Sequence, residues 1–196
     1  AGELHRQEVL SAQVSRMLDN ELTKRFCDSF PAQWLQLEKI VSATPDKTLF
    51  PEYYFLKYNA GMNLMAEPLL LFETVLVEDL SILQFIDSDF SYRSPMLTTW
   101  YDASKPVAFH GPGALVFKRI PVTDRRQGGI FTNAAIMTMT SRSDQTQPIT
   151  RGAWVATVIL NDPPAPPPAD VPLLKNVDAP ADELSIKEKF ASHQEN

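Results

Sequence analysis

Residues 22–37 read LTKRFCDSFPAQWLQL and carry a clear periodic pattern. Apolar side chains recur three or four residues apart, at Leu22, Phe26, Phe30, Trp34 and Leu37. This spacing is that of one face of an α-helix, so the stretch predicts a helix with its aromatic stripe in the core. Because Pro31 lacks an amide hydrogen, we expect the helix to kink or restart there.

The same period extends to both sides of this stretch. Residues 8–20 place Leu10, Val14, Met17 and Leu18 on one helical face. Beyond it, Pro51 suits the first turn of a third helix, which Gly61 and Pro68 should weaken. A further apolar helix is expected over residues 68–77, followed by a short one that Asp79 caps. Residues 5–88 therefore predict a helical bundle.

The second half of the chain has a different character, because prolines and glycines interrupt it. Ser94-Pro95 predicts the start of a short helix, and residues 115–120 approximate the alternation of a strand. Residues 130–139 fit either a short helix, which we favour, or a buried strand. A helix is expected over residues 148–160, and the proline-rich residues 163–172 should form a stiff polyproline strap.

These patterns predict a mainly α fold. We expect a helical bundle, followed by an irregular, loop-rich region with short helices or strands and the polyproline strap. The expected domains are 1–92 and 93–196, and a last short helix is expected over residues 182–193. No internal repeat of fixed period is visible in the sequence.

Composition and charge exclude several classes of protein. A formal net charge of -6 and a pI near 5.1 argue against a nucleic-acid partner, whose phosphates attract clustered Lys and Arg. The apolar run at 69–76 is interrupted by Glu73 and is shorter than the roughly 20 residues of a membrane span, so we expect no transmembrane segment. Cys27 is the only cysteine, and its helical setting predicts a buried, inert thiol.

No constellation of residues predicts a catalytic centre or a metal site. The three histidines, His5, His110 and His193, have no partner at metal-ligand spacing. The run Asp87-x-Asp89 begins like a calcium loop, but its later positions lack the required glycine and glutamate, which favours capping and solvated carboxylates. Whether the protein is an enzyme stays open at this point.

Several stretches nevertheless resemble a known arrangement. The runs AGELHRQEVLSAQVSRMLDN, LFETVLVEDLSILQFIDSDFSY and RGAWVATVILNDPPAPPPADVPLL, in this order, are similar to two consecutive planctomycete-specific domains. Such domains occur in large secreted proteins that also contain c-type cytochrome segments. The most specific part of the resemblance is Arg151-Gly152-x-Trp154, running into the proline block.

The resemblance implies a haem context. In such proteins a Cys-x-x-Cys-His motif follows shortly after the position of His193, so we expect haem c to be attached just outside this chain. It also implies that the chain begins inside a domain, lies in the periplasm or outside the cell, and has other segments or subunits of a cytochrome-type assembly as partners. His193 and Trp154 are then candidate haem contacts, with Met137 and Met139 as candidate neighbours.

The leading functional expectation is a non-catalytic structural part of a secreted or periplasmic multidomain c-type cytochrome, packing around a haem for electron transfer. A first alternative is a module that binds the cell envelope or a polysaccharide, which Trp100 and Tyr101 beside a groove would favour. A second alternative is the substrate-pocket part of a haem oxidoreductase, which needs a cluster of titratable residues.

Overall fold

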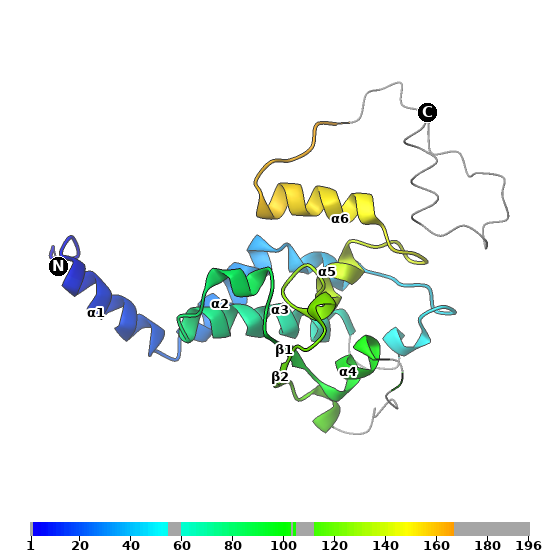
Figure 1. Cartoon of the computed structure of the whole chain (residues 1–196), viewed down its shortest axis with the longest axis horizontal. Helices are drawn as coiled ribbons and strands as arrows, with labels where there is room; N and C mark the ends of the chain where they lie inside the picture. Colours follow the sequence, from blue (N-terminus) through cyan, green and yellow to red (C-terminus); the bar gives the residue numbers. More distant parts are fainter. Residues whose placement is uncertain (1, 55–59, 103, 105–111, 167–196) are drawn as a thin grey trace. The chain divides into compact units, whose positions relative to one another are not determined.

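The computed structural model describes residues 2–54, 60–102, 104 and 112–166. The chain divides into two units, Ala1–Pro163 and Pro164–Asn196. Every helix and strand described below belongs to the first unit (Figure 1). Of the expected strap, residues 163–166 are exposed and without regular structure, and its remainder lies outside the described residues, as do the expected helix at 182–193 and His193.

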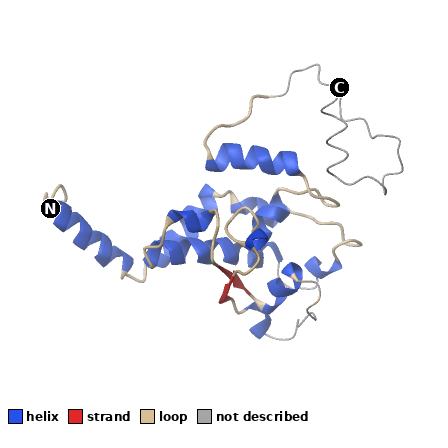
Figure 2. Ribbon diagram, viewed as in Figure 1, coloured by secondary structure: helices blue, strands red, loops and turns tan. Residues whose placement is uncertain are grey.

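The fold class is confirmed, because helices dominate the described chain and its strands form one two-stranded sheet (Figure 2). The first two helices are α1 (Gln7–Leu18) and α2 (Thr23–Trp34). Pro31 lies inside α2 without ending it, and the amide of Leu35 still donates to the Pro31 carbonyl at 2.9 Å. The helix ends where Gln36 takes a left-handed conformation, and a 3-10 helix, Leu37–Ser42, follows.

The prediction that the aromatic stripe of α2 is buried was wrong in part. Phe26 and Phe30 are 49% and 45% exposed. The buried face is the adjacent one, formed by Cys27, Pro31 and Leu35 at intervals of four residues. The helical period is therefore right, and the most deeply buried face is rotated by one residue from the aromatic stripe. The predicted burial of Cys27 is confirmed, and burial raises the pKa of its thiol.

The longest helix is α3 (Ala60–Val77), which packs against α2. It runs through Gly61 and Pro68, both buried, where the sequence predicted a weakened helix and a separate one beginning at Pro68. α3 is long and apolar enough to cross a membrane, but the core helices of soluble proteins can be equally long and apolar. In this protein 50% of α3 is buried within the structure. A 3-10 helix, Ile82–Phe85, follows α3. Asp79 was predicted to cap it, but the cap is Ser81, whose hydroxyl accepts from the Leu83 amide, and Asp79 takes a left-handed conformation with a φ of 51°.

The sheet joins the two halves of the sequence. β1 (Phe90–Arg93) pairs antiparallel with β2 (Lys118–Pro121), with Phe90 opposite Pro121. β1 was not expected, and β2 overlaps the end of the alternation seen at 115–120. The expected domain boundary at 92/93 falls within β1, and the division into two sequence domains stays a prediction.

The described part of the second half also contains three short α-helices and two 3-10 helices, Pro112–Leu115 and Arg125–Gln127. α4 (Pro95–Tyr101) begins where predicted, and the Ser94 hydroxyl accepts from the Leu97 amide at 3.2 Å. α5 (Ala134–Met139) occupies the stretch for which a helix was favoured over a strand. α6 (Pro148–Trp154) continues into a π-helical turn, Val155–Ile159, so the helix expected over 148–160 is confirmed.

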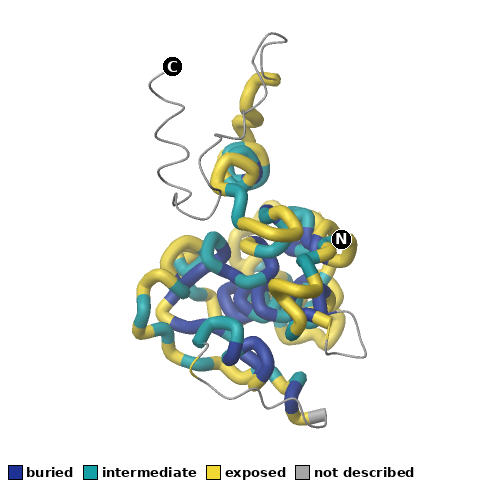
Figure 3. The backbone as a smooth tube through the Cα atoms, turned by 90° about the vertical axis from the view of Figure 1, so that its right-hand side faces the viewer, coloured by how far each residue is buried: buried dark blue, intermediate teal, exposed yellow. Residues whose placement is uncertain are grey.

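The core lies between α2, α3, the Leu37–Ser42 helix and α5. Figure 3 shows the buried segments gathered together with exposed segments around them. Two indoles connect this core to the end of the first unit. Trp154 is buried and its Nε1 donates to the Leu35 carbonyl at 3.3 Å. In return, Trp34 Nε1 donates to the Val158 carbonyl at 3.2 Å. These two hydrogen bonds therefore attach α6 and its π-helical turn to the end of α2.

Candidate functional site

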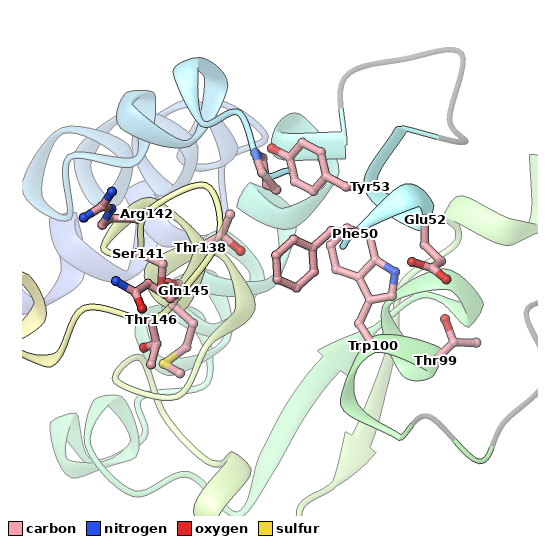
Figure 4. Close-up of a pocket in the computed structure, with 12 residues that line it drawn as sticks. Phe50, Glu52, Tyr53, Thr99, Trp100, Thr138, Ser141, Arg142, Gln145 and Thr146 are labelled. Carbon is pink, nitrogen blue, oxygen red and sulfur yellow. Dashed lines mark hydrogen bonds between the residues drawn. The ribbon is translucent and has the colours of Figure 1, made fainter. Parts of the chain in front are cut away.

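A groove with a volume of about 550 Å³ lies between the 3-10 helix Pro51–Tyr54 and α4 on one side and the end of α5 with the chain after it on the other (Figure 4). One side, which we call the aromatic wall, consists of Phe50, Tyr53 and Trp100. The opposite side, the polar wall, consists of Thr138, Ser141, Arg142, Gln145 and Thr146. A volume of this size lies within the range of about 300–1,000 Å³ that is usual for ligand sites.

Local hydrogen bonds position the aromatic wall. The Asp46 carboxylate accepts from the amides of Thr48 and Leu49 at 2.7 and 3.0 Å, and these bonds hold the pKa of Asp46 below its usual value. The Asp46 carbonyl accepts from the Phe50 amide at 2.8 Å, which leads directly into the Pro51–Tyr54 turn. Tyr53 then stacks on Trp100 of α4, with ring centroids 5.9 Å apart and planes 23° from parallel.

Two polar atoms of this wall are buried and have no hydrogen-bond partner among the residues that the structure describes. They are the Tyr53 hydroxyl and the Trp100 Nε1 group, which belong to the stacked pair. Burial raises the pKa of Tyr53 above its usual value of 10, so the hydroxyl stays protonated at neutral pH. An unsatisfied buried polar group costs about 1–3 kcal/mol, so these two atoms reduce the stability that the stacked pair contributes.

Contacts within the α5–α6 connection hold the polar wall. The Arg142 amide donates to the Gln145 carbonyl at 2.9 Å, which closes a tight turn. Arg151 of α6 braces this turn, since its guanidinium donates to the Thr146 hydroxyl at 2.9 Å and to the Thr140 hydroxyl at 3.3 Å. In the Arg151-Gly152-x-Trp154 motif, Arg151 therefore holds the groove wall and Trp154 fills the core.

A backbone hydrogen bond joins the two segments that carry the walls of the groove. The Asp46 amide donates to the Ser143 carbonyl at 2.7 Å, which connects the turn before the aromatic wall to the turn that carries the polar wall. These residues are nearly one hundred positions apart in the chain, so the groove exists only in the folded protein.

A buried carboxyl group lies behind α4. Glu67, in the middle of α3, is 3% exposed and accepts from the Ser91 hydroxyl at 2.7 Å and the Tyr101 hydroxyl at 2.9 Å. Burial raises the pKa of Glu67 to about 7, although these bonds, a long contact from the Ala134 amide and the charge of Arg93 oppose the shift. This network joins α3, β1, α4 and the start of α5.

Arg93 completes this cluster. Its guanidinium lies 3.9 Å from the centre of the Tyr101 ring and donates to the Gln127 side chain at 2.8 Å. Burial, followed by the charge of Glu67, raises the pKa of Tyr101, so its hydroxyl acts as a donor to the carboxylate. None of Glu67, Arg93 and Tyr101 lines the groove, and the bonds of this cluster join α3, β1 and α4.

The structure separates several residues that the sequence singled out together. Trp100 lines the groove, whereas the adjacent Tyr101 points to Glu67. Met137 also lines the groove, and Met139 packs against the core that contains Trp154. His193 lies outside the described residues. The carboxylates of Asp87 and Asp89 both pair with Arg125, and the described residues contain no group of acidic, His or Cys side chains suited to a metal ion.

Sequence reasoning missed Glu67 and Tyr53. The signal for Glu67 was present, because it is a lone charge within the apolar run NLMAEPLLLF at residues 63–72. Such a charge is either exposed or held by buried partners. Tyr53 had no such signal, since its stacking partner, Trp100, is far away in the sequence.

Comparison with protein families gives two consecutive matches along the chain. Residues 1–103 match the PSD4 model, described as a protein of unknown function (DUF1592). The chain belongs to this family. Residues 126–196 match the PSCyt3 model, also described as a protein of unknown function (DUF1588). No curated protein and no solved structure was similar enough to this chain to count as a match.

These matches confirm the expectation of two consecutive domains. The name PSCyt3 points to an association with cytochromes, while both descriptions leave the function open. The PSD4 match includes α1 to α4 and the aromatic wall, and the PSCyt3 match includes the polar wall, Arg151 and Trp154. The groove therefore combines residues from both matched regions.

Proposed function

We propose that this PSD4 family member is a non-catalytic structural part of a larger, secreted or periplasmic cytochrome-type protein. In this role its exposed apolar faces pack against neighbouring segments that carry haem for electron transfer. The observation that carries the proposal is α1, a helix of 12 residues in which no residue is buried. The name of the PSCyt3 match supports the link to cytochromes.

The apolar face of α1 needs a partner for physical reasons. Leu10, Val14 and Met17 lie on one side of the helix and are 42%, 47% and 59% exposed. An isolated helix of this length is marginal in water, and most helices are stabilised by packing of an apolar face. A covering segment would therefore stabilise α1 and remove this surface from water.

The exposed aromatic face of α2 gives a second surface of the same kind. Phe26 and Phe30 stack on each other, with ring centroids 5.4 Å apart, and both contact the buried Phe72. The nearby 3-10 helix Ile82–Phe85 adds two apolar side chains, Ile82 and Leu83, which are 74% and 68% exposed. Rings held this way offer a rigid apolar surface at little entropic cost.

The described residues lack the Cys-x-x-Cys-His motif that attaches haem c, since Cys27 is the only cysteine of the chain. His5 is the only histidine among them. The indole of Trp154 is a donor only, and its N–H is already used by Leu35. In this proposal haem c is thus attached outside these residues, His193 remains a candidate contact, and the described part supplies apolar cover.

The test is isolation of the native assembly with antibodies against this chain, followed by intact-mass analysis and a visible absorption spectrum. The expected result is a larger assembly with the spectrum of haem c. A colourless protein that consists of this chain alone would overturn the proposal.

A pair of matched variants tests the face itself. Met17→Ser and Leu49→Ser each remove one large apolar side chain, 59% and 58% exposed respectively. Met17→Ser should weaken recovery of the haem-bearing partner roughly tenfold, because burying one such side chain contributes about 1.5–3 kcal/mol. Leu49→Ser, which lies outside α1, should leave recovery unchanged. Equal effects of the two variants would argue against α1 as the packing face.

A further inference from the structure

We propose that Glu67 and Tyr101 form a proton-operated hydrogen-bond switch at the start of α5. In this switch the Tyr101 hydroxyl donates to Glu67 when the carboxyl group is ionised, and to the Thr132 carbonyl when that group is protonated. The inference goes beyond the structural role proposed above and does not depend on it. It is carried by the position of the Tyr101 hydroxyl, which lies 2.9 Å from Glu67 Oε2 and 3.3 Å from the Thr132 carbonyl oxygen.

The Tyr101 hydroxyl has one proton and two acceptors within reach. Its oxygen already accepts from the Ala134 amide at 2.7 Å, so the direction of its own O–H bond is the feature that can change. An ionised carboxyl group is an acceptor only, and it forms stronger hydrogen bonds than a neutral carbonyl does. The hydroxyl therefore donates to Glu67 in the ionised state, which agrees with the shorter of its two distances.

Protonation of Glu67 reverses this bond. The proton comes from water and stays on Oε2, where the protonated carboxyl group becomes a donor. Glu67 then donates to the Tyr101 oxygen, and the Tyr101 proton turns to the Thr132 carbonyl. An O–H···O bond is usually about 2.5–3.0 Å long, so the distance of 3.3 Å should shorten in this state. The Ser91 hydroxyl can donate in both states, because it bonds to the other oxygen, Oε1.

The charged groups around Glu67 leave its own proton as the variable. Arg93 of β1 acts on Glu67 through its charge and keeps that charge, since a guanidinium does not lose its proton in proteins. Cys27 of α2 stays a neutral thiol, because burial raises its pKa. The other titratable side chains of the elements packed on α3 bond elsewhere or are exposed: Tyr92 bonds to Thr74, Lys24 pairs with Asp28 and Glu73, and Arg25, Glu38 and Lys39 are exposed.

Both states of the switch are populated near neutral pH. Burial raises the pKa of Glu67 to about 7, above the value of 4.5 for an unperturbed side chain. The protonated arrangement therefore dominates below about pH 7 and the ionised arrangement above it. Burial also raises the pKa of Tyr101, so its hydroxyl keeps its proton throughout this range.

The switch lies where the two family matches meet in the fold. Glu67 and Tyr101 belong to the region that matches PSD4, whereas Thr132 belongs to the region that matches PSCyt3. The next residue, Asn133, caps α5 by accepting from the Ala135 amide at 3.0 Å. Protonation thus adds a bond that ties the start of α5 to α4, and loss of the proton removes it.

Native-state hydrogen exchange of the 196-residue chain, followed by NMR at about pH 6 and about pH 8, tests the switch. The reporters are the amides of Ala134 and Ala135, both hydrogen-bonded at the start of α5. The Leu35 amide, which donates to the Pro31 carbonyl in α2, reports on the rest of the fold. After correction for the intrinsic effect of pH on exchange, reporter protection relative to Leu35 should fall about fivefold at the higher pH, the effect of one hydrogen bond.

Three variants separate the switch from a general effect of pH. Glu67→Gln should keep the high relative protection at both pH values, because its amide donates to the Tyr101 oxygen and cannot ionise. Tyr101→Phe removes the switching hydroxyl and should abolish the pH dependence. Tyr92→Phe is the matched control, since the Tyr92 hydroxyl lies 2.7 Å from the neutral Thr74 hydroxyl of α3, and it should keep the wild-type dependence. If Tyr101→Phe does not fold, the wild type and Glu67→Gln decide the question.

Three results would each overturn the proposal. One is relative protection in the wild type that is as high at the higher pH as at the lower. Another is a Glu67→Gln variant whose relative protection at the higher pH is as low as that of the wild type. The last is a Tyr92→Phe variant that loses the pH dependence as completely as Tyr101→Phe does.

Discussion

Replacing Glu67 with glutamine is expected to change how the stability of the chain depends on pH. The pKa of Glu67 is about 7 in the folded protein, compared with 4.5 for an unperturbed side chain. The folded chain therefore binds this proton more tightly than the unfolded chain. The stabilising contribution of the protonated carboxyl is complete below pH 4.5, decreases as the pH rises, and is lost above about pH 7. At about 1.4 kcal/mol per pKa unit, the loss amounts to about 3 kcal/mol.

Urea unfolding of the wild type and Glu67→Gln at about pH 4 and about pH 8 measures this effect. Glutamine is neutral at both pH values, so its free energy of unfolding relative to wild type should rise by about 3 kcal/mol between them. Any change in the bonds to Ser91 and Tyr101 adds a constant that cancels in this difference. Glu38→Gln, at an exposed position, controls for the loss of a charge. A Glu67→Gln difference that is the same at both pH values would refute the reasoning, because it would mean that burial does not penalise the carboxylate.

Two further pairs of substitutions test the packing by urea unfolding. Gly129→Ala should lower the free energy of unfolding by at least about 2 kcal/mol, because φ is +75° and a Cβ atom would lie 2.4 Å from the Ile86 carbonyl oxygen. Gly152→Ala, where a Cβ meets nothing within 4 Å, should instead raise it by about 0.5–1 kcal/mol. Ile136→Ala, at a fully buried position, should lower it by about 2–5 kcal/mol, and Ile149→Ala, 62% exposed, by less than about 0.5 kcal/mol. Similar values within either pair would contradict the burial described here.

Local sequence signals predicted the helices well. The periods of α1, α2 and α6 depend on residues three and four apart, and the Ser94 cap depends on an amide three residues away. They failed where a local rule competes with packing. Proline should interrupt a helix, yet Pro31 and Pro68 are buried within continuous helices, because the packed faces of α2 and α3 extend past them.

The candidate site was predictable only in fragments. Trp100 was singled out for a groove on the basis of its residue type, and it lines one. Its neighbour Tyr101 was expected there too, but it faces the opposite way, because successive residues of a helix point about 100° apart. Tyr53 and the polar wall could not be found from the sequence, since no local pattern relates them to Trp100.

The sequence by itself determined the mainly α class and the positions of most helices, because these follow from contacts within a few residues. Only the tertiary structure decided which face of α2 is buried, that β1 pairs with β2, and that Tyr53 and Trp100 share one wall of a groove. The physical reason is that each of these depends on contacts between residues far apart in the chain, which form only when the core assembles.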